Sequence, residues 1–178
     1  MKWLLIAVAA VAALIVAVVV IGSLRPRNHV ARVRGRLNAN PDAVWQVLRG
    51  FETWAEWNSA TQKVERTTDL NGKQVWLFHG RWGKMPMILD TDESPRRMRT
   101  VVGEGAGFSG SWTYEIEPQG DGCTLTLTEE GSVRNPVFRF MMMFHGNHAT
   151  MLRFFTDLAA RVGQPGVRAE IVHVDASQ

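Results

Sequence analysis

The sequence predicts an α+β protein in which a curved antiparallel sheet of about seven strands surrounds a long C-terminal helix, preceded by an N-terminal transmembrane helix. Three observations predict this class. Residues 3–24 carry no charged side chain. Between residues 61 and 133, apolar and polar residues alternate in several short segments, as in strands buried on one face. After Asn135, an apolar stripe recurs at helical spacing over about 27 residues.

The N-terminal segment is long enough to cross a membrane. As a helix its 22 residues would extend roughly 33 Å, and the hydrocarbon core of a bilayer is about 30 Å thick. The apolar region of a signal peptide usually has only about 7–15 residues and ends in a small-x-small cleavage site. No clear Ala-x-Ala precedes Arg25. We therefore interpret residues 1–27 as a single-pass anchor with a basic flank; a cleaved signal peptide is the alternative.

The charges beside this segment indicate its orientation. Arg25 and Arg27 follow the apolar segment, and only Lys2 and the amino terminus precede it. The positive-inside rule then places the C-terminal domain in the cytoplasm, on a small bias. We expect the same two arginines to contact anionic lipid headgroups. Nucleic acid is not an expected partner, because 20 basic residues stand against 17 acidic ones and no basic stripe contains interleaved aromatic residues.

The soluble domain is predicted to begin with one strand and two short helices. In residues 29–37, arginines alternate with Ala, Val, Gly and Leu, which is the period of a half-buried strand. Asn40 is a suitable helix cap, and Pro41 is a suitable first helical residue. Gly50 ends that helix early. Residues 51–57 carry aromatic side chains at three-residue intervals, as expected of a second short helix.

Strands dominate the middle of the chain. Asn71 and Gly72 form the residue pair that most strongly predicts a two-residue hairpin turn. Trp112 and Tyr114 alternate with polar residues, and so does Leu125 in the following segment, so these side chains are expected to face a core. The expected strands are 61–68, 73–80, 85–91, 97–102, 111–117 and 123–133.

The last major element is predicted to be one long helix. Asn135 and Pro136 provide a cap and a first helical residue, and the helix is expected to continue to about Val162. Residues 28–163 would thus form the folded domain, and residues 164–178 a polar tail with a short strand near its end. A cavity is expected between sheet and helix, because a curved sheet meets a straight helix imperfectly. The apolar stripe of the helix contains Phe138, Met142, His145, Ala149 and Leu152.

Five segments carry a resemblance to a known superfamily. They are Asn40–Trp45, Phe51–Asn58, Gly110–Pro118, Gly122–Gly131 and Asn135–Phe140. They resemble, in order, the first helix entry, the aromatic second helix, the paired late strands and the gripping helix of the START-like, helix-grip superfamily, also called SRPBCC. Within it, the sequence looks most similar to the polyketide cyclase/dehydrase-type group over roughly residues 29–162. The resemblance implies a helix-grip fold and leaves function open, because the superfamily includes lipid carriers, hormone receptors, cyclases and cochaperone domains.

Other motifs do not predict a cofactor or metal. Residues 105–110 read Gly-x-Gly-x-x-Gly, but a strand rather than a helix follows, so a loop at the cavity mouth is expected instead of a dinucleotide site. His145 and His148 are spaced to share a metal, yet only the distant His79 or Glu129 would complete the ligand set. The single cysteine excludes an intramolecular disulfide and a multi-cysteine metal site.

The candidate ligand-cavity residues are aromatic, apolar or polar side chains expected on the helix-facing surface of the sheet or on the helices that cover it. Strand alternation predicts that Tyr114 faces inward, whereas His79 and Arg99 have no preferred face. No residue is assigned a catalytic role. The candidates are Trp54, Trp57, His79, Met87, Arg99, Trp112, Tyr114, Leu125, Phe138, Met142 and His145.

These observations predict a membrane-anchored domain that binds a hydrophobic small molecule or lipid in a cavity between the sheet and the C-terminal helix. Apolar walls would supply most of the affinity, and a few polar groups would orient the ligand. The first alternative is a polyketide cyclase/dehydratase-like enzyme, which requires two polar side chains converging in the cavity. The second is a protein-interaction module with a collapsed cavity, without a pocket of about 300 Å³.

Overall fold

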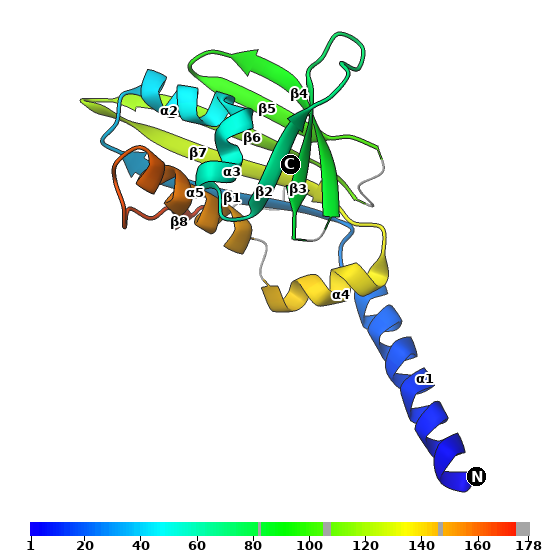
Figure 1. The fold of residues 1–178 in the computed structure, drawn as a ribbon. Coiled ribbons are helices and arrows are strands. Elements are labelled where there is room, and N and C mark those ends of the chain that lie inside the picture. Colours follow the sequence, from blue (N-terminus) through cyan, green and yellow to red (C-terminus); the bar gives the residue numbers. More distant parts are fainter. Residues whose placement is uncertain (82, 105–107, 146–147, 174–178) are drawn as a thin grey trace.

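A computed structural model describes residues 1–81, 83–104, 108–145 and 148–173 (Figure 1). The helices are α1 Lys2–Ser23, α2 Pro41–Arg49, α3 Trp54–Trp57, α4 Pro136–His145 and α5 Ala149–Arg161, with a 3-10 turn η1 at Phe51–Thr53. The strands are β1 Asn28–Leu37, β2 Thr61–Arg66, β3 Val75–Gly80, β4 Gly83–Glu93, β5 Arg97–Val102, β6 Ser109–Gln119, β7 Gly122–Ser132 and β8 Glu170–Ile171.

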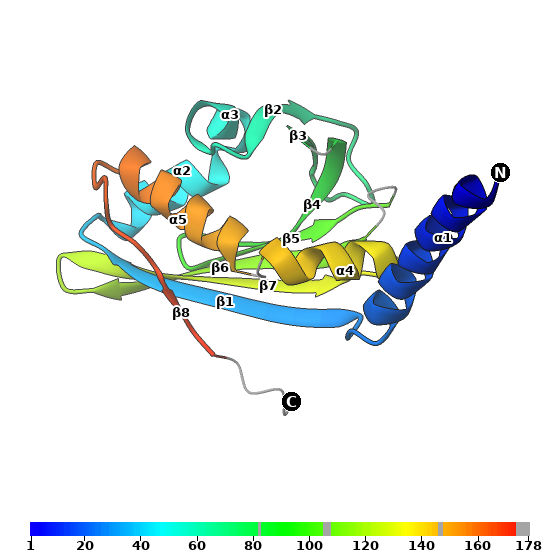
Figure 2. The same cartoon turned by 90° about the horizontal axis from the view of Figure 1, so that it is seen from below.

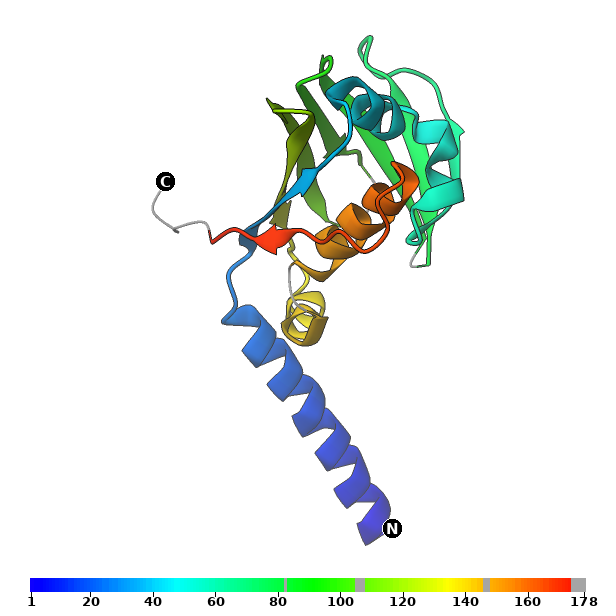
Figure 3. The ribbon, with the colours of Figure 1, turned by 90° about the vertical axis from the view of Figure 1, so that its left-hand side faces the viewer.

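The described strands form one antiparallel sheet in the order β2-β3-β4-β5-β6-β7-β1-β8. The sheet curves around α5, while α2 and α3 cover one end of the same face (Figure 3). This confirms the predicted α+β fold with a curved antiparallel sheet. The sheet has eight strands rather than about seven, because Glu170 and Ile171 pair with Arg34 and Val33 at its edge.

The local signals read from the sequence produce the elements expected of them. The side chain of Asn40 caps α2 by accepting a hydrogen bond from the backbone N–H of Asp42 at 2.8 Å. Asn71 and Gly72 both have positive φ angles, 52° and 77°, inside a turn that Leu70 and Lys73 close. Only residues tolerant of the left-handed region fit such a two-residue turn.

The C-terminal helix differs from the prediction of one continuous helix. It is divided into α4 and α5, which lie on the same side of the sheet in Figure 2. α5 packs on β1 and α3, whereas α4 packs against α1. His148 lies in a turn and is the residue that precedes α5. The helix therefore divides where its apolar partner changes from the sheet to α1.

The core lies between α5 and the sheet. Met151, Phe155 and Leu158 of α5 are buried against it. Phe155 approaches β1 so closely that a Cβ atom on Gly35 would lie 2.3 Å from its ring. A glycine at this point of β1 therefore allows the helix to sit directly on the strand.

α1 extends away from this core as a single apolar helix (Figure 1). It is long and apolar enough to cross a membrane, and Gly22 is its only buried residue. The unburied length therefore has no protein partner within the described chain.

Candidate functional site

The helix-facing surface of the sheet carries four of the eleven residues singled out from the sequence. Met87, Tyr114 and Leu125 are buried there, and Trp112 is partly buried on the same face. Trp54 is buried opposite them on α3. Alternation along β6 therefore correctly placed Tyr114 facing inward.

One end of this surface is filled by aromatic rings. The Trp54 ring centroid lies 5.0 Å from Phe154, 5.3 Å from Phe78 and 5.4 Å from Trp57. Tyr114 joins the cluster 5.7 Å from Phe154. Offset and edge-on contacts at these distances are favourable packing geometries. The cavity expected along the C-terminal helix is thus occupied by side chains beside α5, and Trp54 and Trp57 pack with one another there.

A polar group lies on the same surface farther along β7, toward α4. Glu129 accepts a hydrogen bond from the indole N–H of Trp112, with an Nε1–Oε2 distance of 3.1 Å. Its second oxygen lies 3.1 Å from Nε2 of His29. The side chains of His29 and Glu129 are 15% and 16% exposed. A carboxylate this far removed from water is held by paired donors, as the cost of its desolvation requires.

No motif in the sequence points to this group. Glu129 stands out there only as a distant metal ligand, and His29 does not stand out. A signal for both residues was nevertheless present in the strand alternation. Glu129 is in phase with the apolar Leu125 and Leu127, and His29 is in phase with Ala31. A charged or polar residue at an inward position of a strand whose other inward residues are apolar indicates a site.

Tyr114 belongs to the aromatic cluster and is two residues from Trp112 on the same face of β6. Burial raises the pKa of its phenol well above the ordinary value; the Thr100 hydroxyl opposes the shift, and the negative charge of Glu129 adds to it. Tyr114 therefore remains protonated at neutral pH. It can donate a hydrogen bond to a ligand and cannot act as a base there.

His79 and Arg99 lie on the outer face of the sheet, away from the helices, and this corrects their candidacy as cavity residues. Phe78 and Met98 face inward, so their strand neighbours face outward. Nε2 of His79 lies 2.6 Å from Oε2 of Glu65. A hydrogen bond from Lys63 is the main cause that lowers the pKa of the Glu65 carboxyl; desolvation opposes it, and a hydrogen bond from His79 adds a smaller lowering.

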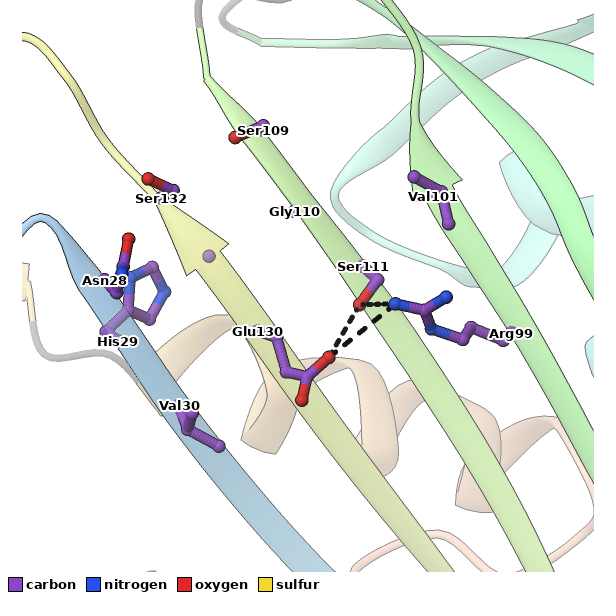
Figure 4. A pocket seen from close by; sticks show the side chains of 11 residues that line it. Asn28, His29, Val30, Arg99, Val101, Ser109, Gly110, Ser111, Glu130 and Ser132 are labelled. Atoms are coloured by element: carbon purple, nitrogen blue, oxygen red, sulfur yellow. Dashed lines mark hydrogen bonds and ion pairs between the residues drawn. The ribbon is translucent and has the colours of Figure 1, made fainter. Parts of the chain in front are cut away.

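Two open grooves lie outside the core. One, of about 320 Å³, is on the outer face of the sheet, where Arg99 contacts Ser111 at 3.2 Å and Glu130 at 3.8 Å (Figure 4). The other, of about 630 Å³, lies between α2 and β3. The arginines that line it, Arg49 and Arg161 among them, bind acidic partners of this chain. Neither groove lies between the sheet and α5.

The remaining candidates belong to α4. Phe138 is exposed on a helix that packs against α1, so it is not part of a cavity wall. The side chains of Met142 and His145 lie outside the described residues, as do residues 105–107 of the glycine-rich motif. Among the side chains that are described, no three His, Cys, Asp or Glu residues come together in a metal-binding group.

Comparison with known proteins identifies a family for the folded domain. The family model described as "Polyketide cyclase / dehydrase and lipid transport" matches residues 29–163. No curated protein matches the chain.

Solved structures with the same fold share little sequence with this chain. The Zhui aromatase/cyclase from Streptomyces sp. R1128 is 17% identical, with a TM-score of 0.67, over 76% of this chain and 94% of that one. Truncated norcoclaurine synthase from Thalictrum flavum is 13% identical, with a TM-score of 0.61, over 76% and 93%. A START superfamily protein from Mycobacterium smegmatis is 15% identical, with a TM-score of 0.62, over 76% and 97%. At these identities the similarity establishes the fold alone.

Proposed function

The chain belongs to the polyketide cyclase/dehydrase and lipid transport family, and from this membership we propose that its domain binds a hydrophobic small molecule or lipid while α1 holds it at a membrane. The observation that carries the proposal is the Glu129 carboxylate. It is held by Trp112 and His29 on an otherwise apolar surface and is not fully buried. A few polar groups on an apolar wall are the usual means of orienting a ligand.

The chemistry of this group specifies the ligand further. An ionised carboxylate accepts hydrogen bonds and repels a second carboxylate. Tyr114, the next polar residue along β6 on this face, is protonated. The favoured ligand is therefore a long apolar molecule with a hydroxyl or another donor group, in preference to a free fatty acid.

The contact between α1 and the domain supports an anchor in preference to a cleaved signal peptide. Gly22 lies against the backbone of Pro136, where a Cβ atom would be only 1.9 Å from the carbonyl oxygen. The guanidinium of Arg139 donates to the Gly22 carbonyl at 2.8 Å. Cleavage after the apolar segment would remove a partner of a buried arginine. An anchor also keeps the binding surface near the bilayer, where apolar ligands are concentrated.

Photolabelling of the full chain in lipid vesicles tests the proposal. The probe is a fatty alcohol that carries a diazirine, and the labelled chain is digested with trypsin. Peptide 3–27 contains the anchor, and peptide 100–134 contains β6 and β7. We expect both peptides to be labelled, and the second to be labelled more weakly by the matching fatty acid.

Glu129→Gln is the informative variant, and Glu130→Gln is its matched control on the opposite face of the same strand. Loss of one hydrogen bond to a charged group costs about 1.5–3 kcal/mol, so labelling of peptide 100–134 should fall at least about tenfold in Glu129→Gln. It should be unchanged in Glu130→Gln. Labelling of peptide 3–27 without peptide 100–134 would reject the binding surface, and no labelling of peptide 3–27 would reject the anchor.

One observation favours a cyclase- or dehydratase-like enzyme as the second candidate. His29 and Glu129 converge at 3.1 Å, and a carboxylate that orients an imidazole is a frequent arrangement in general acid–base catalysis. An enzyme would convert a poly-β-ketone thioester with loss of water, and His29→Asn would abolish that conversion. A binding protein would return the thioester unchanged, as mass spectrometry would detect.

A further inference from the structure

α1 and α4 are joined by a buried arginine. Arg139 of α4 is only 7% exposed. Its guanidinium donates to the carbonyl of Gly22 at the end of α1, and to the carbonyls of Val133 and Arg134 at 2.9 and 2.8 Å. Three carbonyl acceptors satisfy much of its donor capacity and hold its orientation. The start of α4 is therefore fastened to the last turn of α1.

The outward surface of α4 is apolar. Its sequence, PVFRFMMMFH, contains only one arginine and one histidine among apolar residues, and the arginine is the buried Arg139. Val137, Phe138 and Met143 are exposed. A surface helix of a water-soluble domain normally turns polar residues outward. This exposed surface therefore calls for an apolar partner.

Basic side chains surround the junction of the two helices. Arg25 and Arg27 follow α1, and Arg134 precedes α4; all three are exposed. Within the described part of the chain, no acidic side chain pairs with them. Such a rim of positive charge beside apolar surface complements an anionic lipid surface.

We propose that α4 lies in the interface of the bilayer that α1 crosses, with Val137, Phe138 and Met143 inserted among the lipids. The inference rests on the proposed anchoring by α1. The end of α1 must reach the membrane surface, and Arg139 and Pro136 contact that end directly. α4 consequently lies at the same level, between the anchor and the sheet (Figures 1 and 3).

This placement also puts the Glu129 end of the binding surface nearest to the membrane. β7 leads from Glu129 to α4, and the backbone N–H of Val133 donates to the carbonyl of Arg27 at 2.9 Å. The Glu129 end of the sheet is thereby tied to the chain that leaves the membrane. A lipid would pass from the bilayer to the sheet along α4 without crossing bulk water.

Spin-label depth measurements on the full chain test the inference. The chain is placed in vesicles of phosphatidylcholine and phosphatidylglycerol, with a nitroxide on Phe138→Cys or Met143→Cys. Cys123 is buried, and burial raises the pKa of its thiol, so the label goes to the introduced cysteine. Collisions with oxygen and with a water-soluble nickel complex should place both labels about 5–10 Å inside the headgroup boundary.

Leu70→Cys is the matched control. Leu70 is 52% exposed and Phe138 48%, but Leu70 belongs to the β2–β3 connection, which lies far from α1 in Figure 1. Its label should collide freely with nickel. A water-exposed label at Phe138 and Met143, on protein that floats with the vesicles, would overturn the inference and leave the anchor intact. Protein that does not float would overturn both.

Discussion

Tyr114 is the single tyrosine of the chain, and its surroundings determine its chemistry. It is buried, and desolvation raises the pKa of its phenol above the ordinary value of about 10. The fold favours the neutral phenol. Tyr114 therefore makes its full contribution to the free energy of unfolding at pH values below about 10, the pKa of an unfolded tyrosine. The contribution is lost as the pH rises toward the folded pKa.

The first prediction concerns this titration. In the folded chain, tyrosinate absorbance should stay absent at pH values slightly above 10, and in urea it should appear near pH 10. The free energy of unfolding should decrease over the same alkaline range. A folded chain whose tyrosinate absorbance appears at the same pH as in urea would contradict the buried position of Tyr114. Because no second tyrosine is present, the signal needs no assignment.

Among the elements, the pairing of α1 with α4 has the clearest energetic basis. Arg139 joins the two helices by donating to three carbonyls near their ends. Removing a buried donor leaves its acceptors without partners, which costs more than the net value of the bonds.

The second prediction is that Arg139→Ala lowers the free energy of unfolding of the full chain in lipid nanodiscs by about 1.5–3 kcal/mol. Denaturant titration followed by tryptophan fluorescence measures it. Arg153→Ala, an exposed arginine of α5, is the matched control and should change stability by less than about 0.5 kcal/mol. Equal effects of the two substitutions would show that the arginine bridge does not stabilise the junction.

At the scale of the whole molecule, the end of α1 is packed against the folded domain through α4. α4 is packed against α1, while α5 grips the sheet. The apolar side chains of the molecule are thus divided into a core beside α5 and an exposed region around α1 and α4. The aromatic cluster fills the end of the core beside α5. The His29–Glu129 pair lies at the end of the sheet that is nearer to α4.

The third prediction concerns a chain that lacks residues 1–24. Without α1, the apolar surface of α4 loses its partner, and we expect the shortened chain to bind vesicles that contain phosphatidylglycerol. Salt should weaken this binding, because exposed arginines contribute to it. Sedimentation with vesicles at low and high salt measures the effect. Phe138→Asp should reduce the binding, whereas Leu70→Asp, on the β2–β3 connection, should not.

Several elements could be predicted because their signals are local. The Asn40 cap, the turn at Asn71 and Gly72, and the inward position of Tyr114 depend on residues adjacent in sequence. The family was also recognisable from short motifs. The positions of His79 and Arg99 were undecided because β3 and β5 are short, and the inward positions of Phe78 and Met98 become visible only in the assembled sheet.

By itself, the sequence determined the α+β class, the apolar N-terminal helix, the succession of strands along the chain and the family. Hydrophobic periodicity, caps and turn residues act over a few residues and can be read in one dimension. Only the tertiary structure decided that the last helix divides, that α4 packs against α1 through Arg139, and that His29 meets Glu129 across 100 residues. These contacts arise when burial selects partners from distant parts of the chain, and no local pattern encodes that choice.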